Sequence, residues 1–350
     1  MTPLNGGQQS WAARQARGMY PTPPESGDGF ERSAFPMLLG LAHPPTPMSY
    51  QERHTSPSHI IGEVVTHTIN SGEGAGTQIL TVSTSFHPGS HTPESDLILR
   101  SSDAIHFFVH TDYINKASQS ALPAFLSYSV PGVKDGIVSI PETGRVLNII
   151  LHAVYGTSVA RNCPSCADLI EAVNKMPLYG LAPRNLIRPD TPLYTLLLTH
   201  APLNPIAVYT TAAHHDIFEL AKQTSSHLLA FPLNEIDDNT AALMGHVYLK
   251  RLFLLHMNRT DAARKVFLQP PAIHPITKKC NFEDQKKVKR AWALGSTYLA
   301  WELRADLSTH RIKSVFEPLV SELDCADCRE MLSKRIREVL VAWAAVKCTI

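Results

Sequence analysis

The sequence predicts an α+β protein with a small sheet surrounded by helices, an α-helical C-terminal domain and a disordered N-terminal arm. Residues 1–59 are rich in Pro, Ser and Gly and show no helical or strand periodicity, which is typical of disorder. Residues 95–200 begin with short β-branched and aromatic runs between helical patterns, which favours an αβ domain. Residues 201–350 carry only helical patterns separated by Pro and Gly, and residues 60–94 are interpreted as a hairpin and linker.

The composition limits the classes of protein that fit. At 350 residues the chain has room for two ordinary domains and a tail, and its net charge of +1 provides no general attraction to nucleic acid or anionic membrane. Six cysteines are too few for a disulfide scaffold, and the first residues do not resemble a signal peptide. No apolar run approaches the about 18 residues of a membrane span. We therefore expect a cytoplasmic or nuclear protein that does not contact membrane.

The glycine-rich segment SGEGAG at 71–76 lies at the centre of the expected hairpin over 60–86. A phosphate-binding loop should open directly into a helix and carry a lysine, whereas these glycines precede strand formers and lack that lysine. A hairpin is therefore favoured over a nucleotide site.

The αβ pattern begins with two strands, at 96–100 and 105–110, that are close enough to form a tight hairpin. Thr111 or Asp112 can cap the helix that follows, and 120–127 has the pattern of a second short helix.

A third strand is predicted at 136–141, where its proline ends it. A helix then follows Thr143 and stops near Gly156, because apolar residues recur at helical spacing and glycine favours a helix end. Further helices are predicted at 165–180, 191–201, 204–230, 237–268, 282–304 and 312–346.

Two segments resemble the core of a BTB/POZ interaction domain: DLILRSSDAIHFFVHTDYINKAS at 96–118 and GIVSIPETGRVLNIILHAVYG at 136–156. The wider stretch 95–350 resembles a group of BTB-domain proteins of mushroom-forming (basidiomycete) fungi. Markers of that group are NPIAVYTTAAHHDIFELAKQTSSHLL at 204–229, YLKRLFLLH at 248–256, RAWALGSTYLAWELRADLSTH at 290–310 and the closing KRIREVLVAWAAVKCTI.

The resemblance implies a protein–protein interaction module without catalysis or cofactor, whose protein partners are unknown and whose self-association is open. Asp96 and His110 match the marker residues of the BTB core, namely the acidic residue that opens the first strand and the histidine that closes the second. Thr111 stands where many members carry a basic residue, and Asp112 where an apolar one is common. These departures weaken the expectation of the usual homodimer.

Two alternative functions stay open. Ubiquitin-ligase adaptors of the cullin type carry a hydrophobic-x-Glu motif before the third strand, but 129–136 contains no glutamate and Glu142 follows that strand. A chromatin- or DNA-associated regulator could use the basic helical segment 278–290 to contact phosphate, although Glu283 and Asp284 interrupt it.

The cysteines are the most suggestive candidates for a metal site. Cys163 and Cys166 form one CxxC pair, and Cys325 and Cys328 form another, but they lie too far apart in sequence for a compact zinc motif. We therefore predict no metal site. The alternative is a three-thiolate site of Cys280, Cys325 and Cys328, completed by a histidine such as His274 or His310.

No catalytic residue is predicted. The cluster His214-His215-Asp216 offers imidazole and carboxylate side by side, but adjacent helical residues do not face each other. We therefore interpret it as structural and expect the protein not to be an enzyme.

Overall fold

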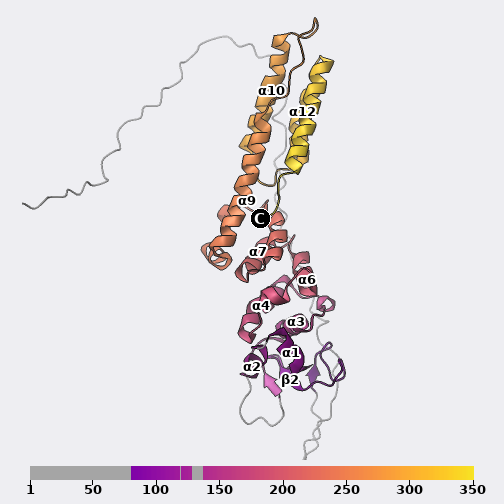
Figure 1. Cartoon of the computed structure of the whole chain (residues 1–350), viewed down its shortest axis with the longest axis vertical. Coiled ribbons are helices and arrows are strands. Elements are labelled where there is room, and N and C mark those ends of the chain that lie inside the picture. The colour runs from indigo at the N-terminus through magenta and orange to yellow at the C-terminus, as the bar shows by residue number, and fades with distance from the viewer. Residues whose placement is uncertain (1–79, 119, 128–136) are drawn as a thin grey trace, which may run out of the picture. The chain divides into compact units, whose positions relative to one another are not determined.

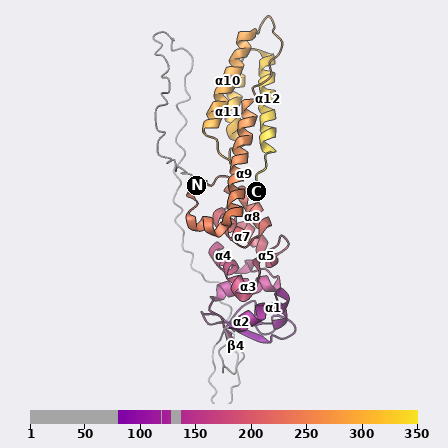
Figure 2. The same cartoon turned by 60° about the vertical axis from the view of Figure 1, so that its left-hand side comes forward.

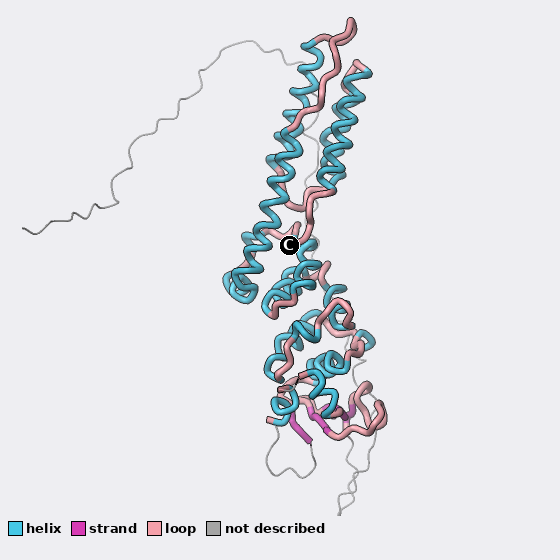
Figure 3. Tube along the Cα trace, in the orientation of Figure 1, coloured by secondary structure: helices cyan, strands magenta, loops and turns pink. Residues whose placement is uncertain are grey.

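The computed structural model describes residues 80–118, 120–127 and 137–350. The expected disordered arm, most of the expected hairpin over 60–86 and the segment 129–136 lie outside the described residues. The described chain is α+β and mostly helical, with one small sheet (Figures 1 and 3). This confirms the predicted fold class at the level of its secondary structure.

The sheet has four strands in the order β1-β3-β2-β4. β2 and β3 form the predicted antiparallel hairpin, while β4 pairs with β2 and β1 with β3, both in parallel. Leu99 lies opposite both Phe107 and Val138, and all three side chains are buried. The strands are β1 (Thr81–Val82), β2 (Leu97–Arg100), β3 (Ile105–Val109) and β4 (Ile137–Ser139).

Three helices cover this sheet, and each lies where the sequence predicts one: α1 (Thr111–Ala117), α2 (Ala121–Leu126) and α3 (Gly144–Tyr155). The Thr143 hydroxyl accepts a hydrogen bond from the Val146 N–H and so caps α3. Gly156 ends α3 with φ of 66°, the left-handed conformation that glycine adopts most easily.

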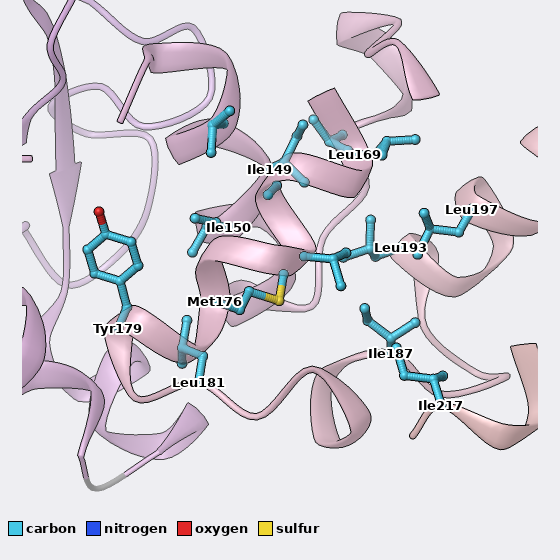
Figure 4. Close-up of a cluster of buried hydrophobic side chains, with 14 of the residues drawn as sticks. Ile149, Ile150, Leu169, Met176, Tyr179, Leu181, Ile187, Leu193, Leu197 and Ile217 are labelled. Atoms are coloured by element: carbon cyan, nitrogen blue, oxygen red, sulfur yellow. The ribbon is translucent and has the colours of Figure 1, made fainter. Parts of the chain in front are cut away.

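The helices that follow share the same hydrophobic core, which runs from Phe86 to Leu252 without a break at position 200. These helices are α4 (Cys166–Lys175), α5 (Pro183–Leu186), α6 (Pro192–His200), α7 (Pro205–His214) and α8 (Phe218–Ser225). Figure 4 shows Ile149 of α3 beside Leu169 of α4 in this core.

A second core lies between the last four helices, which run alongside one another (Figures 1 and 2). Trp292 stacks on Phe316 with ring centroids 4.1 Å apart, and its indole N–H donates to the Phe267 carbonyl over 2.9 Å. The helices are α9 (Asp238–Leu268), α10 (Phe282–Trp301), α11 (Thr309–Ser321) and α12 (Ala326–Ala344).

Two segments that the sequence predicts as single helices are divided into separate helices, and a third, 237–268, is kinked at Gly245, whose φ of 71° and ψ of 159° are not helical. The segment 204–230 breaks between α7 and α8, where Asp216 has φ of 54° and therefore cannot continue a right-handed helix. The segment 312–346 breaks between α11 and α12, and Cys325 becomes the N-cap of α12. Both breaks let shorter helices turn back onto the core.

Arg259 is a buried charge in α9 whose guanidinium holds three backbone carbonyls. Its Nε donates to Ala305 over 2.7 Å, and its Nη1 donates to Val346 and Lys347 over 2.9 and 3.1 Å. The guanidinium also lies 4.4 Å from the ring centroid of Trp343. Arg259 thus ties α9 to the chain after α10 and after α12.

In the parts of the chain that the structure describes, no helix combines the length and apolar character needed to cross a membrane.

We expect Arg259→Leu to lower the free energy of unfolding by about 1.5–3 kcal/mol, because the carbonyls lose a charged donor. Arg259→Lys should recover little of this loss, since an ammonium cannot reproduce the planar guanidinium, which donates from two nitrogens at once. Urea unfolding followed by circular dichroism measures the effect. The control is Arg264→Leu, which removes an exposed pair with Asp261 and should cost under about 0.5 kcal/mol. Equal losses in Arg259→Leu and this control would contradict the role of Arg259.

Candidate metal centre

The two marker residues of the αβ core have structural partners. The Asp96 carboxylate accepts hydrogen bonds from the backbone N–H and the hydroxyl of Thr111, at the first residue of α1. Burial alone would raise the pKa of Asp96, but these hydrogen bonds lower it below its usual value. Thr111 is therefore the residue that fixes Asp96 against α1.

His110 connects the hairpin to α3. Its Nε2 lies 2.8 Å from the Pro93 carbonyl and its Nδ1 lies 2.9 Å from the Tyr155 hydroxyl. The His110 backbone N–H also donates to that hydroxyl. One consistent arrangement is an Nε2–H that donates to Pro93 while Nδ1 accepts from Tyr155. Both ring nitrogens of His110 therefore have hydrogen-bond partners within the protein.

Glu142 is also structural. Its carboxylate is buried, lies 3.3 Å from the Lys175 ammonium and accepts a hydrogen bond from the Tyr179 hydroxyl over 3.3 Å. The segment 129–136, which was compared with the cullin-binding motif, lies outside the described residues.

The histidine pair before α8 does not form a metal site. His215 contacts the Asn174 amide oxygen through Nε2 over 2.8 Å, and Asp216 accepts a hydrogen bond from the Tyr248 hydroxyl over 2.7 Å. His214 contacts the Leu243 carbonyl instead. Burial lowers the pKa of His215 to about 4, and the neighbouring charge of His214 adds to this.

Four metal-ligating side chains meet at the start of α10 and α12: His274, Cys280, Cys325 and Cys328, which we call the Cys3His cluster. One ligand atom from each lies within 4.8 Å of the others. Among the described residues, this is the one group of three or more potential ligands that meets this spacing. The structure therefore selects His274, not His310, as the histidine that accompanies the three cysteines.

The distances within the cluster are those between neighbouring ligands of one ion. The Cys280 and Cys328 sulfurs are 3.6 Å apart, and His274 Nε2 lies 3.2 Å from Cys328 Sγ and 3.4 Å from Cys325 Sγ. A disulfide would require about 2.05 Å between the sulfurs. All six cysteines of the chain are free.

The local sequence explains why these side chains converge. Cys325 is the N-cap of α12 and Cys328 lies in its first turn. Cys280 directly precedes Asn281, the N-cap of α10, and a pair of backbone hydrogen bonds with Thr277 folds the chain before it into a tight turn. Cys325 and Cys328 therefore lie at the N-terminus of α12, which carries partial positive charge.

The orientation of His274 leaves Nε2 directed at the thiols. Its Nδ1 lies 2.6 Å from the Pro275 carbonyl, which an N–H at that position would satisfy. Gln285, a buried side chain of α10, donates to the His274 carbonyl over 2.9 Å and fixes this backbone. This is the arrangement by which a second layer of hydrogen bonds orients a ligating imidazole.

The thiols differ in acidity. The backbone N–H groups at the start of α12, first that of Cys328, lower the pKa of the Cys325 thiol. Burial raises the pKa of Cys280 and raises that of Cys328 to about 12. The two buried thiols thus stay protonated near neutral pH unless a cation takes the place of the proton.

The remaining candidate residues lie outside the cluster. Cys163 and Cys348 are exposed, and Cys166 begins α4 behind the Ser165 N-cap. In the basic segment 278–290, Lys286 pairs with Glu283 and Lys287 with Asp284 along α10. Part of that positive charge is therefore balanced within the helix itself.

Comparisons with protein-family models, with curated proteins and with solved structures found no match to this chain. The interpretation of the cluster therefore depends on its geometry and donor chemistry.

We expect Asp96→Ala to lower the free energy of unfolding by about 1 kcal/mol, because the first N–H of α1 loses its acceptor. Thr111→Val should cost less, since it removes the hydroxyl but keeps the backbone donor. Thermal unfolding of the pair measures this order. A larger loss in Thr111→Val than in Asp96→Ala would contradict it.

The urea midpoint should fall as the pH is lowered from 6.5 toward 4. Burial lowers the pKa of both His152 and His215 to about 4 in the folded chain, against 6.5 when exposed. Within this window the unfolded chain binds more protons, so acid favours unfolding. Replacing both histidines with Gln should flatten the dependence between these two pH values. The same slope in the variant and the original chain would rule out these histidines as its source.

Proposed function

We propose that the protein is a non-enzymatic protein–protein interaction module whose αβ part is of the BTB/POZ type. The order of elements supports this class: a β2–β3 hairpin, two short helices, a strand parallel to β2 and then helices. The motifs at 96–118 and 136–156 lie on these elements.

The observation that carries the proposal is the apolar outer face of α9. Tyr248, Leu252 and Leu255 are buried against the rest of the protein. The outer face nevertheless carries four more large apolar side chains, which are 41–56% exposed: Val247, Phe253, Leu254 and Met257. At about 100° per residue they cover roughly 120° of the helix surface. A helix that is apolar on both sides favours a partner that covers the second side.

The charge pattern favours an acidic helical partner. Lys250 is exposed within this face, and residues 246–258 contain no carboxylate. Two copies that paired symmetrically through the face would bring Lys250 near its counterpart. An amphipathic helix could pack its apolar residues on the outer face of α9 and place carboxylates beside them to pair with Lys250.

A photo-crosslinking residue placed at Phe253 of the full chain tests this surface in the cells that produce it. We expect one adduct of discrete mass, whose crosslinked peptide carries apolar residues at helical spacing with carboxylates beside them. Val247→Glu with Leu254→Glu should abolish the adduct and leave the unfolding temperature almost unchanged, because both residues are over 40% exposed.

The matched control is Val247→Ile with Leu254→Met, which keeps the face apolar and should keep the adduct. Lys265→Glu changes charge on the same helix beyond the face and should also keep it. An adduct of twice the chain mass would show that a second copy, not an acidic partner, covers the face. No adduct in either the original chain or the conservative pair would contradict the proposal.

A DNA-associated role for 278–290 remains the second candidate, supported by exposed Lys278 and Lys279 at the turn before α10. Salt-dependent binding to duplex DNA that is lost on charge reversal of this pair would favour it.

A further inference from the structure

We propose that the Cys3His cluster binds one zinc ion as a structural site. The donor set gives the chemical reason. Three sulfurs and one imidazole nitrogen are a standard ligand set for structural zinc, while harder ions such as Mg²⁺ and Ca²⁺ prefer oxygen.

The distances between donor atoms agree with tetrahedral zinc. With bonds of about 2.3 Å to sulfur and about 2.0–2.1 Å to nitrogen, neighbouring ligands lie about 3.8 Å apart for two sulfurs and about 3.5 Å for sulfur and nitrogen. The observed separations are 3.6 Å between Cys280 and Cys328, and 3.2 and 3.4 Å from His274 Nε2 to Cys328 and Cys325. The donors therefore need only small shifts to surround one ion.

The surroundings favour a structural ion over a catalytic one. A catalytic zinc keeps one position open for water or substrate, whereas this cluster supplies four protein donors. The cavity beside His274 and Cys328 has a volume of about 10 Å³, about the space for one water molecule.

The charge balance also agrees. Three thiolates, one neutral imidazole and Zn²⁺ together carry one negative charge, and Cys325 is the N-cap of α12, whose N-terminus carries partial positive charge. Cys280 and Cys328 are buried with Val288, so a thiolate there needs a cation.

The segment 269–281 is what the ion would hold in place. It joins α9 to α10 without regular structure apart from the turn between Thr277 and Cys280. His274 and Cys280 lie in this segment, while Cys325 and Cys328 belong to the start of α12. One ion would therefore fasten the long connection to a helix that lies far from it in sequence.

Metal analysis of the full chain, purified with reduced thiols and without a chelating column, tests the proposal. We expect about one zinc per chain by plasma mass spectrometry. Addition of Co²⁺ to chain stripped of metal should produce the visible absorption of tetrahedral cobalt and its thiolate charge-transfer band. Metal-free chain with no cobalt spectrum would overturn the proposal, and iron in place of zinc would overturn the assignment of the ion.

Variants separate the cluster from the other cysteines. Cys328→Ser should lose the zinc and the cobalt spectrum, whereas Cys163→Ser and Cys348→Ser should keep both. Because Cys328→Ser could also disturb the fold, Gln285→Ala provides a second measurement. It leaves every ligand in place but frees the His274 backbone, and should weaken zinc binding about tenfold in competition with a chromophoric chelator. Unchanged affinity in Gln285→Ala together with zinc retained in Cys328→Ser would contradict the site.

Hydrogen exchange gives a readout independent of metal content. Removal of zinc should speed amide exchange in 269–281 and in the first turn of α12, and leave β2 and β3 protected. Uniform loss of protection across the chain, or no change at all, would contradict a local structural role.

Discussion

One helix, α9, contributes to both of the larger hydrophobic cores in the part of the chain that the structure describes. Tyr248 and Leu252 of α9 complete the core that begins at the sheet, and Ala263 and Phe267 belong to the core of the last four helices. Between these two sets lies Arg259, whose guanidinium donates hydrogen bonds to carbonyls from two distant parts of the chain. The desolvation of this charge is tolerated only because those carbonyls are in place, which makes α9 intolerant of a change in register.

Local patterns were sufficient to predict several elements of the αβ part. The β2–β3 hairpin and α3 depend on turn residues, β-branched runs and a Thr and a Gly at the helix ends, all of which act over a few residues. The division of 204–230 was not predictable in this way, because it depends on Asp216 adopting a left-handed conformation. Periodicity does not report such a change, and Asp is one of the few residues that tolerates it.

The cysteine cluster shows a different limit. Sequence spacing identified Cys325 and Cys328 as a pair and suggested Cys280 and a histidine, but could not decide between His274 and His310. Only the packing of α10 against α11 and α12 brings the connection after α9 to this pair. The prediction of no metal site followed from the sequence separation between the cysteine pairs. Sequence separation does not report which side chains the packing of helices brings together.

The contact between Cys280 and Cys328 joins positions 48 residues apart, and α10 and α11 lie wholly inside the loop that it closes. Any bond between these ends, through a metal or through oxidation, would act on the unfolded chain by restricting the conformations of everything in between. During synthesis this closure must wait for the first turn of α12 to emerge. Until then α10 and α11 lack their contacts with α12.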